Sequence, residues 1–271
     1  MLYSDSLYLP SYSCPSLSLL GHHRDIEVKI TSSLPISIST DVDLLSLSPS
    51  PAPVKPPTKL TLIREANMPV NCVTVSTYQD CTYVGLGDGR IMRVGQDSAV
   101  TQFATVAGSM YGMAIDGGQL YAVSGDQNLQ SVNVFNLNTS KHVRSWNITD
   151  TVGYYCSKLV VVGNQVVIAD KANKVLCVYT LTGQLVKQIP CQQITGGWVC
   201  MCTSDNDNII LSDCKSNRVY KISITSGKSL WESGSVVNPR GVTCYNNQYV
   251  LVFEGDIGSK KIHVLEINTG K

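Results

Sequence analysis

Short apolar runs separated by turn residues recur along the chain after residue 69, and most alternate between apolar and polar positions. One stretch shows the arrangement most clearly, with runs at 158–162, 166–170, 175–179 and 184–189. Alternation with a period of two is typical of strands that bury one face, and pairs such as Gly163-Asn164 are typical of hairpin turns. The pattern therefore predicts a unit of four antiparallel strands.

This unit occurs five times. In each copy an apolar strand runs into an aspartate, a polar turn with basic residues follows, and a second alternating strand begins. The aspartates are Asp88, Asp126, Asp170, Asp213 and Asp256, at spacings of 38, 44, 43 and 43 residues. Four-stranded units of about 40 residues are the signature of β-propeller blades, which bury their faces by stacking around a ring. We therefore predict an all-β propeller over residues 59–271, with blades at 59–105, 106–149, 150–192, 193–236 and 237–271.

The repeated aspartate is interpreted as a structural residue. At the end of a strand its carboxylate can accept backbone N–H groups and fix the following turn. The alternative is a ring of metal-binding aspartates, which we disfavour because equivalent positions in a propeller are spread around a disc. We expect no metal site.

Composition changes sharply near Pro69. Nine of the eleven prolines lie at or before this residue, and twenty of the 21 glycines lie after it. Residues 1–58 are rich in Ser, Leu and Pro, and the two short alternating runs at 26–30 and 36–38 bury too little surface to offset the entropy of ordering them. We expect this leader and linker to be mostly disordered.

Composition also limits the partner and the compartment. The net charge is +1, so bulk electrostatics indicate neither nucleic acid nor membrane. No run of about 18 apolar residues could span a bilayer, and the N-terminal residues lack the pattern of a signal peptide. The ten cysteines lie singly and lack zinc-finger spacing. They are interpreted as small buried residues in a reducing compartment, which predicts a cytoplasmic protein; disulfides or a metal are the alternative.

Two stretches, 166–189 and 209–233, share the order apolar strand, Asp, polar turn, Asn-(Lys/Arg)-Val, strand, Gly turn, strand. Asn173-Lys174-Val175 and Asn217-Arg218-Val219 are their clearest triplets. This order resembles the NHL repeat, strongly in blades three and four and more weakly in the other three. A WD40 propeller is disfavoured because the chain has no Trp-Asp dipeptide, and a kelch propeller because the double glycines fall at different blade positions.

The resemblance implies a ring of six blades, whereas five are visible. Either Lys59–Arg64 supplies the outer strand of blade five and closes the ring, or the sequence is truncated and a sixth blade is missing. We favour truncation. An open ring exposes strand edges, so the chain is expected to aggregate when isolated.

NHL propellers often form the C-terminal module of tripartite-motif (TRIM) proteins, in which the propeller binds target proteins or RNA. An upstream RING domain supplies the ubiquitin-ligase activity of those proteins. The residues given contain no Cys/His zinc pattern of that kind. The resemblance therefore implies a binding role here and no ligase activity.

No catalytic constellation is evident. The segment Gly227-Lys228-Ser229 matches the end of a P-loop. The first glycine of that motif would fall at position 222, which is Ile222, and the segment lies in a hairpin and not between a strand and a helix. The four histidines pair with no recognisable nucleophile, and the segments that lead into the innermost strands carry no carboxylate. We predict a protein that is not an enzyme, with no catalytic residue and no cofactor. A propeller hydrolase or lyase is the remote alternative.

One face of the disc is predicted to be basic and aromatic. In a propeller, the loops that lead into the inner strands share a face with the turns between second and third strands. The candidate ligand-face residues are Arg90, Tyr111, Tyr155, Lys171, Lys174, Trp198, Lys215, Arg218, Arg240, Lys260 and Lys261. The structural interpretation is that the basic residues are solvated turn residues and the aromatic residues fill gaps between blades. The functional interpretation is a platform for a ligand.

The predicted function is a protein-interaction or substrate-recognition module, and single-stranded RNA binding is the alternative. Exposed aromatic rings can anchor either kind of partner, and cations can attract phosphate or acidic peptide. We favour a protein partner because basic residues exceed acidic ones by only two after Pro69. No membrane and no small-molecule substrate are expected.

Overall fold

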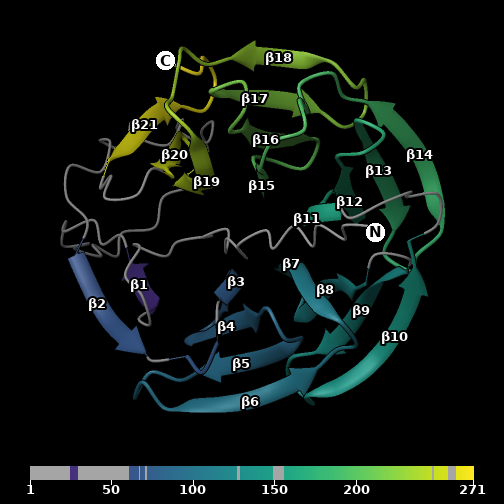
Figure 1. Cartoon of the computed structure of the whole chain (residues 1–271), viewed down its shortest axis with the longest axis vertical. Helices are drawn as coiled ribbons and strands as arrows, with labels where there is room; N and C mark the ends of the chain where they lie inside the picture. Colours follow the sequence, from purple (N-terminus) through teal and green to yellow (C-terminus); the bar gives the residue numbers. More distant parts are fainter. Residues whose placement is uncertain are drawn as a thin grey trace, which may run out of the picture.

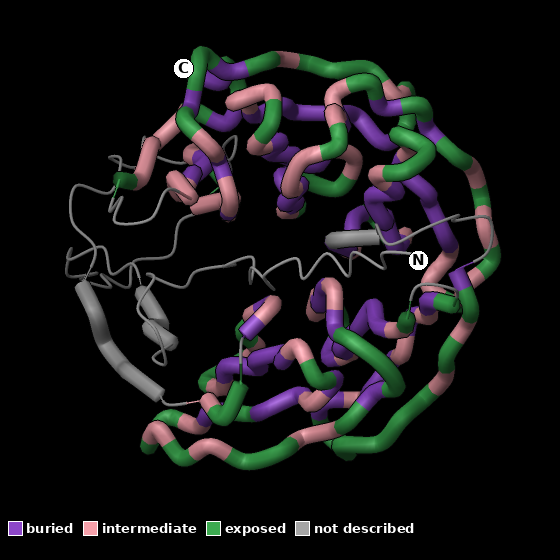
Figure 2. Tube along the Cα trace, viewed as in Figure 1, coloured by how far each residue is buried: buried purple, intermediate pink, exposed green. Residues whose placement is uncertain are grey.

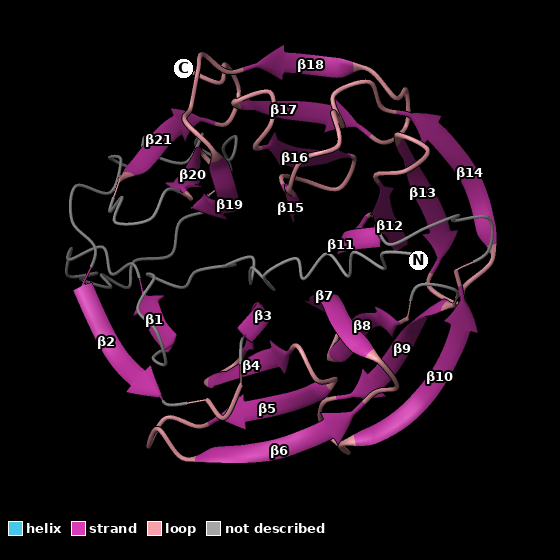
Figure 3. Ribbon diagram, viewed as in Figure 1, coloured by secondary structure: helices cyan, strands magenta, loops and turns pink. Residues whose placement is uncertain are grey.

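The chain forms an all-β, five-bladed propeller in a computed structural model (Figure 1). The structure describes residues 25–29, 61–66, 68–70, 72–126, 129–148, 156–245, 247–255 and 261–271. Within these ranges the chain consists of strands joined by turns and loops, without helices (Figure 3). The predicted all-β class and propeller architecture are confirmed.

Each blade is an antiparallel sheet whose strands follow one another in sequence, from the inner strand next to the axis to the outer strand at the rim. Blade one contains β3 (Cys72–Tyr78), β4 (Cys81–Leu86), β5 (Arg90–Val94) and β6 (Val100–Thr105). Blade two contains β7 (Ser109–Asp116), β8 (Gln119–Gly125), β9 (Gln130–Asn136) and β10 (Lys141–Asn147). Blade three contains β11 (Cys156–Val162), β12 (Gln165–Asp170), β13 (Val175–Thr180) and β14 (Leu185–Pro190).

Blade four contains β15 (Val199–Thr203), β16 (Asn208–Asp213), β17 (Arg218–Ser223) and β18 (Ser229–Glu232). Blade five has three strands, β19 (Pro239–Tyr245), β20 (Tyr249–Glu254) and β21 (Ile262–Glu266). No fourth strand pairs with β21 among the described residues.

A separate two-stranded sheet lies in the sector of the ring between blade five and blade one (Figure 1). It pairs β1 (Asp25–Lys29) with β2 (Thr61–Ala66). The segment Lys59–Arg64, the alternative candidate for the outer strand of blade five, therefore overlaps β2, but β2 pairs with β1 and not with β21. The alternating run at 26–30 largely coincides with β1. The predicted disorder of the rest of the leader lies outside the described residues.

Burial follows the position of each strand within a blade (Figure 2). In β12 the five residues from Val166 to Asp170 are all buried. In the outer strand β10 no residue is buried, and five of the seven are exposed. The alternation in the sequence predicts strands with one buried face. The structure corrects this for the middle strands of blades two, three and four: each lies between two neighbouring blades, so both of its faces are covered.

The core is divided into layers between consecutive blades. Blades three and four share the largest layer, which includes Val167, Leu176, Leu211 and Ile222, all almost fully buried. Separate layers join blades one and two, two and three, and four and five. Stacking of blades, rather than one central core, therefore holds the ring together.

The glycine turns between third and fourth strands have a role in packing that the sequence did not predict. Gly183 lies against the Trp146 ring of the preceding blade, and Gly270 lies against Trp231 in the same way. Both glycines have positive φ angles, +94° and +69°, and an added Cβ would lie 2.4–2.5 Å from the indole. Glycine is needed at these positions because the turn is left-handed and the outer strand of the preceding blade approaches closely.

Candidate functional site

The antiparallel order of the strands assigns the loops to two faces of the disc. The loop that leads into each inner strand lies on the same face as the turn between the second and third strands, and the other two turns lie on the opposite face. The first of these is called the loop face below. It carries the predicted ligand residues, whereas the opposite face carries Asp80, Asp116, Asp205 and Asp207 in or beside its turns.

Three of the predicted residues meet on the loop face, and each comes from a different blade. The Lys171 Nζ lies 5.1 Å from the centroid of the Trp198 ring, and the Arg240 guanidinium carbon lies 5.6 Å from it. Lys171 begins the turn after β12, Trp198 precedes β15, and Arg240 lies in β19. Both distances are within the range of cation–π interactions, so blades three, four and five together build a basic cluster around one half-buried indole.

The position of Trp198 is fixed by the turn beneath it. The Trp198 N–H donates to the Cys214 Sγ at 2.9 Å, and the Cys214 N–H donates to the Trp198 carbonyl at 3.0 Å. An added Cβ on Gly197 would lie 2.8 Å from the Cβ of Lys215. The loop before β15 is therefore docked closely on the turn between β16 and β17, which brings Lys215 beside the cluster.

The aspartates at the ends of the second strands organise these turns. Asp170 Oδ1 accepts the N–H groups of Ala172 and Asn173, at 2.9 and 3.1 Å. Asp213 is fully buried, and its Oδ2 accepts the Ser216 N–H at 3.0 Å and the Thr195 hydroxyl at 2.5 Å. Both carboxylates therefore hold their turns, whereas the second oxygen of Asp213, Oδ1, is buried without a hydrogen-bond partner among the described residues.

Two further aspartates also accept a backbone N–H group in the equivalent turns of blades one and two. Asp88 accepts the Arg90 N–H and forms an ion pair with the Arg90 guanidinium at 2.7 Å. The hydrogen bond from Arg90 holds the pKa of Asp88 below its ordinary value. Asp126 accepts the Leu129 N–H at 2.9 Å. Asp256 lies outside the described residues.

The other predicted ligand residues do not join the Trp198 cluster. Arg218 forms an ion pair with Glu232 at 3.2 Å and donates to the Ser233 carbonyl, so its side chain makes contacts within blade four. Arg90 is held by Asp88 in blade one. The half-buried Tyr111 packs against the layer between blades two and three. Lys174 and Lys261 are exposed, and Tyr155 and Lys260 lie outside the described residues.

The two triplets that carry the family resemblance are offset by one residue in the structure. Asp170 pairs with Val175 at the start of β13, and Asp213 pairs with Arg218 at the start of β17. The left-handed residue of each turn is Lys174 in blade three (φ 54°) and Asn217 in blade four (φ 56°). Lys174 therefore corresponds to Asn217 in space, and not to Arg218, because the turn geometry counts from the aspartate.

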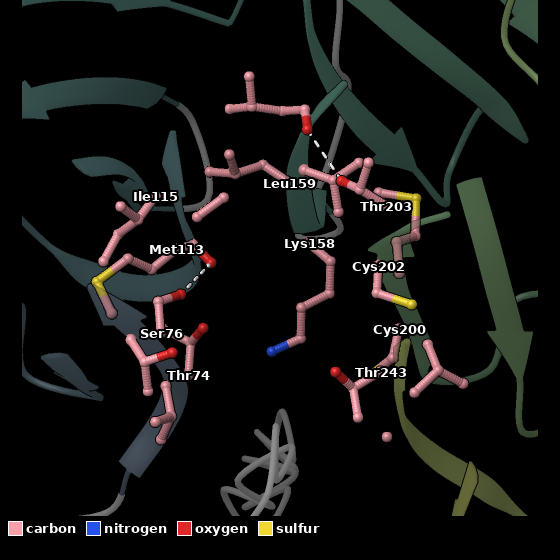
Figure 4. A pocket seen from close by; sticks show the side chains of 18 of the residues that line it. Thr74, Ser76, Met113, Ile115, Lys158, Leu159, Cys200, Cys202, Thr203 and Thr243 are labelled. Carbon is pink, nitrogen blue, oxygen red and sulfur yellow. Dashed lines mark hydrogen bonds between the residues drawn. The ribbon is translucent and has the colours of Figure 1, made fainter. Parts of the chain in front are cut away.

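A cavity of about 320 Å³ in the centre of the ring is a second candidate site (Figure 4). All five inner strands line it: β3, β7, β11, β15 and β19. Lys158 of β11 projects into it, and the cavity wall carries the hydroxyl groups of Thr74, Ser76, Thr203 and Thr243. The sequence argument missed this lysine. The signal that could have identified it is a single charged residue at the head of the apolar strand 158–162.

Two cysteines of adjacent inner strands also contact each other in this region. The Sγ atoms of Cys202 in β15 and Cys244 in β19 are 3.5 Å apart. The hydrogen bond between them raises the pKa of Cys202, which burial raises further, and lowers the pKa of Cys244. Cys244 is thus the thiol of the pair that more readily forms a thiolate.

Within the described ranges, no three His, Cys, Asp or Glu side chains are placed to hold a metal ion. The same part of the chain contains no helix that is both long and apolar enough to cross a membrane.

Comparisons with known proteins support the fold alone. No protein-family model and no curated protein sequence matches the chain. Among solved structures, a protein of unknown function from Bacteroides caccae matches with a TM-score of 0.60 and 9% identity, over 78% of this chain and 83% of its own. A functionally unknown protein from Desulfotomaculum acetoxidans matches with a TM-score of 0.56 and 12% identity, over 76% of this chain and 68% of its own.

Proposed function

We propose that this propeller is a non-catalytic binding module that recognises an acidic segment of a partner protein through its loop face. The observation that carries the proposal is the cluster in which Lys171 and Arg240 flank the Trp198 ring. Tryptophan and arginine are the residues most enriched among those that dominate binding energy at protein interfaces. A rigid scaffold that presents them on loops from three blades is well suited to recognition.

The surroundings of the cluster favour a partner with both acidic and apolar side chains. Val237, in the loop that leads into β19, is 48% exposed, and Leu129 on the same face is 56% exposed. The neighbouring carboxylates Asp170 and Asp213 are buried in turn hydrogen bonds. Among the described residues, the charged side chains that contact the Trp198 ring are cations, which would attract carboxylates on a partner.

The finer assignment is that the chain is an NHL-type propeller that acts as the recognition module of a TRIM-like protein in the cytoplasm. It is supported by the order of strand, aspartate, polar turn and glycine turn in blades three and four. The one-residue offset between Lys174 and Arg218 weakens the triplets as evidence. The shared positions of Asp170 and Asp213, and of Gly183 and Gly227, remain consistent with the resemblance.

The test first selects acidic peptides that bind the full chain from a displayed library. The affinity of the full chain for the selected peptides is then measured. We expect Trp198→Ala to weaken binding of the selected peptide about thirtyfold, because an interface residue of this kind contributes about 2 kcal/mol to the binding free energy. Lys171→Ala should weaken it less. The matched control is Lys228→Ala, an exposed lysine in the β17–β18 turn on the opposite face, which should bind as the wild type does.

Two outcomes would reject the proposal. One is equal affinity of wild type, Trp198→Ala and Lys228→Ala for every selected peptide. The other is a preference for single-stranded RNA, seen as retention of a random RNA pool that falls steeply with salt and whose salt dependence is reduced by charge reversal at Lys174 and Arg218.

A further inference from the structure

The central cavity holds a buried charge that no described carboxylate balances. The Lys158 residue is 6% exposed, and its Nζ donates to the Val73 carbonyl of β3 at 3.1 Å. This bond reaches from blade three to blade one, past the inner strand of blade two. An ammonium group has three hydrogen-bond donors, and no ion pair with Lys158 occurs in the described part of the chain.

An uncompensated ammonium in such a place is costly. Charged groups that leave water need a counter-charge or hydrogen bonds that replace the lost hydration. All the other described residues that line the cavity are uncharged. The cavity therefore has a net positive centre, and an anion is the ligand whose charge would offset the cost.

The wall of the cavity offers both polar and apolar contacts to such a ligand. The Lys158 side chain lies between Thr74 and Ser76 on one side and Thr243 on the other (Figure 4). Met113 and Ile115 of β7, with Val242 of β19, contribute apolar surface to the same space. A volume of about 320 Å³ exceeds what a bare phosphate ion fills and falls in the range of small-molecule sites.

We propose that the central cavity binds a small organic anion, whose carboxylate or phosphate group pairs with Lys158 and whose body contacts the apolar side of the channel. The hydroxyl groups of Thr74 and Thr243 would donate to the remaining oxygens of the anion. This site is separate from the loop face around Trp198, and it does not depend on the function proposed for that face.

The test uses three probes of similar size on the full chain: benzoate, phenyl phosphate and the neutral benzamide. We expect one or both anions to bind the wild type, and benzamide to bind about tenfold more weakly, because a hydrogen bond to a charged group contributes about one factor of ten or more. Binding of benzoate alone indicates a carboxylate ligand, and binding of phenyl phosphate alone indicates a phosphate ester. Calorimetry gives the affinities, and a ligand-dependent rise in melting temperature gives an independent readout.

Lys158→Met should lose about tenfold or more in affinity for the anions, while its binding of benzamide stays unchanged. The control Lys228→Met removes an exposed lysine far from the channel and should behave as the wild type. Without ligand, Lys158→Met should melt at the same temperature as the wild type or higher, because it removes an uncompensated buried charge. If it fails to fold, Thr243→Val replaces it and should weaken the anions severalfold.

The proposal is overturned if Lys158→Met binds the anions as tightly as the wild type does. It is also overturned if neither anion binds the wild type at about 10 mM, or if benzamide binds as tightly as the tighter-binding anion.

Discussion

Blades four and five carry the same turn signals in their sequences, yet they are buried to different extents. In β16 and β17 of blade four, five of the six residues of each strand are buried. In β20 of blade five only Val250, Leu251 and Val252 are buried, and β21 has no buried residue. The difference lies in the neighbours: blade four shares a core layer with blade three and another with blade five, whereas blade five contributes only to the latter.

The burial of a blade therefore depends on its neighbours as much as on its own residues. Inner strand β19 packs on β15 and β16, and no comparable packing joins it to β3 among the described residues. In a ring of repeats, each unit contributes its own stability plus the interfaces on its two sides. We therefore expect blade five to be less stable than blade four.

The largest expected effect is on stability, measured with a matched pair of substitutions. Leu211→Ala in β16 removes a fully buried side chain between blades three and four, and we expect a loss of about 2–5 kcal/mol in the free energy of unfolding. Leu265→Ala in β21 removes a half-buried side chain and should cost about 1 kcal/mol, because water already reaches it. Denaturant unfolding of both variants measures the difference. Equal losses would show that blade five is as well supported as blade four.

A smaller effect is expected at the edge of blade five, where β21 has no described partner strand on its outer side. The strand carries Ile262, Val264 and Leu265, and exposed apolar edges pair with other chains. We expect the average mass from light scattering to rise with protein concentration, and Val264→Lys to suppress that rise. The control is Val186→Lys on β14, an outer strand that already carries polar positions. A wild type that stays monomeric at every concentration contradicts this prediction.

The smallest expected effect is chemical, at the contact between blades four and five. The hydrogen bond between the Cys202 and Cys244 thiols lowers the pKa of Cys244, so its reactive thiolate is present at a lower pH than that of an ordinary thiol. Burial raises the pKa of Cys191 to about 11, so this thiol stays protonated near pH 8.

Iodoacetamide at pH 8 should therefore modify Cys244 several times faster than Cys191, as followed by peptide mass spectrometry. In the unfolded chain the two rates should become similar, which serves as the internal control. If Cys191 reacts as fast as Cys244 in the folded protein, the contact between Cys202 and Cys244 is not formed as described.

The strands and turns were predictable because they depend on residues close together in the chain. The alternating runs mark the strands, and Asp170 and Asp213 mark turns that their carboxylates hold. The disfavoured interpretation of the 59–64 segment, as the outer strand of blade five, does not occur in the structure, where β2 covers residues 61–66 and pairs elsewhere. Its actual partner, β1, is a short run in the leader whose pairing no local pattern indicates.

The candidate sites were predictable only in part. The rule for loops on one face selected Lys171, Trp198 and Arg240, whose side chains the structure brings together. It also included Arg90 and Arg218, whose side chains are held by local acidic partners. The cavity at Lys158 was missed, because one lysine in an apolar strand does not indicate which side of the strand faces the axis.

The sequence by itself determined the repeated unit, its strand order and its turns, since hydrogen bonds and backbone angles within a hairpin involve residues only a few positions apart. Only the tertiary structure decided which basic residues meet Trp198, that Lys158 lies buried in the channel, and that blade five shares a core layer with one blade only among the described residues. These features depend on how blades more than 40 residues apart stack around the ring. That stacking is set by the burial of whole strand faces, which no single segment specifies.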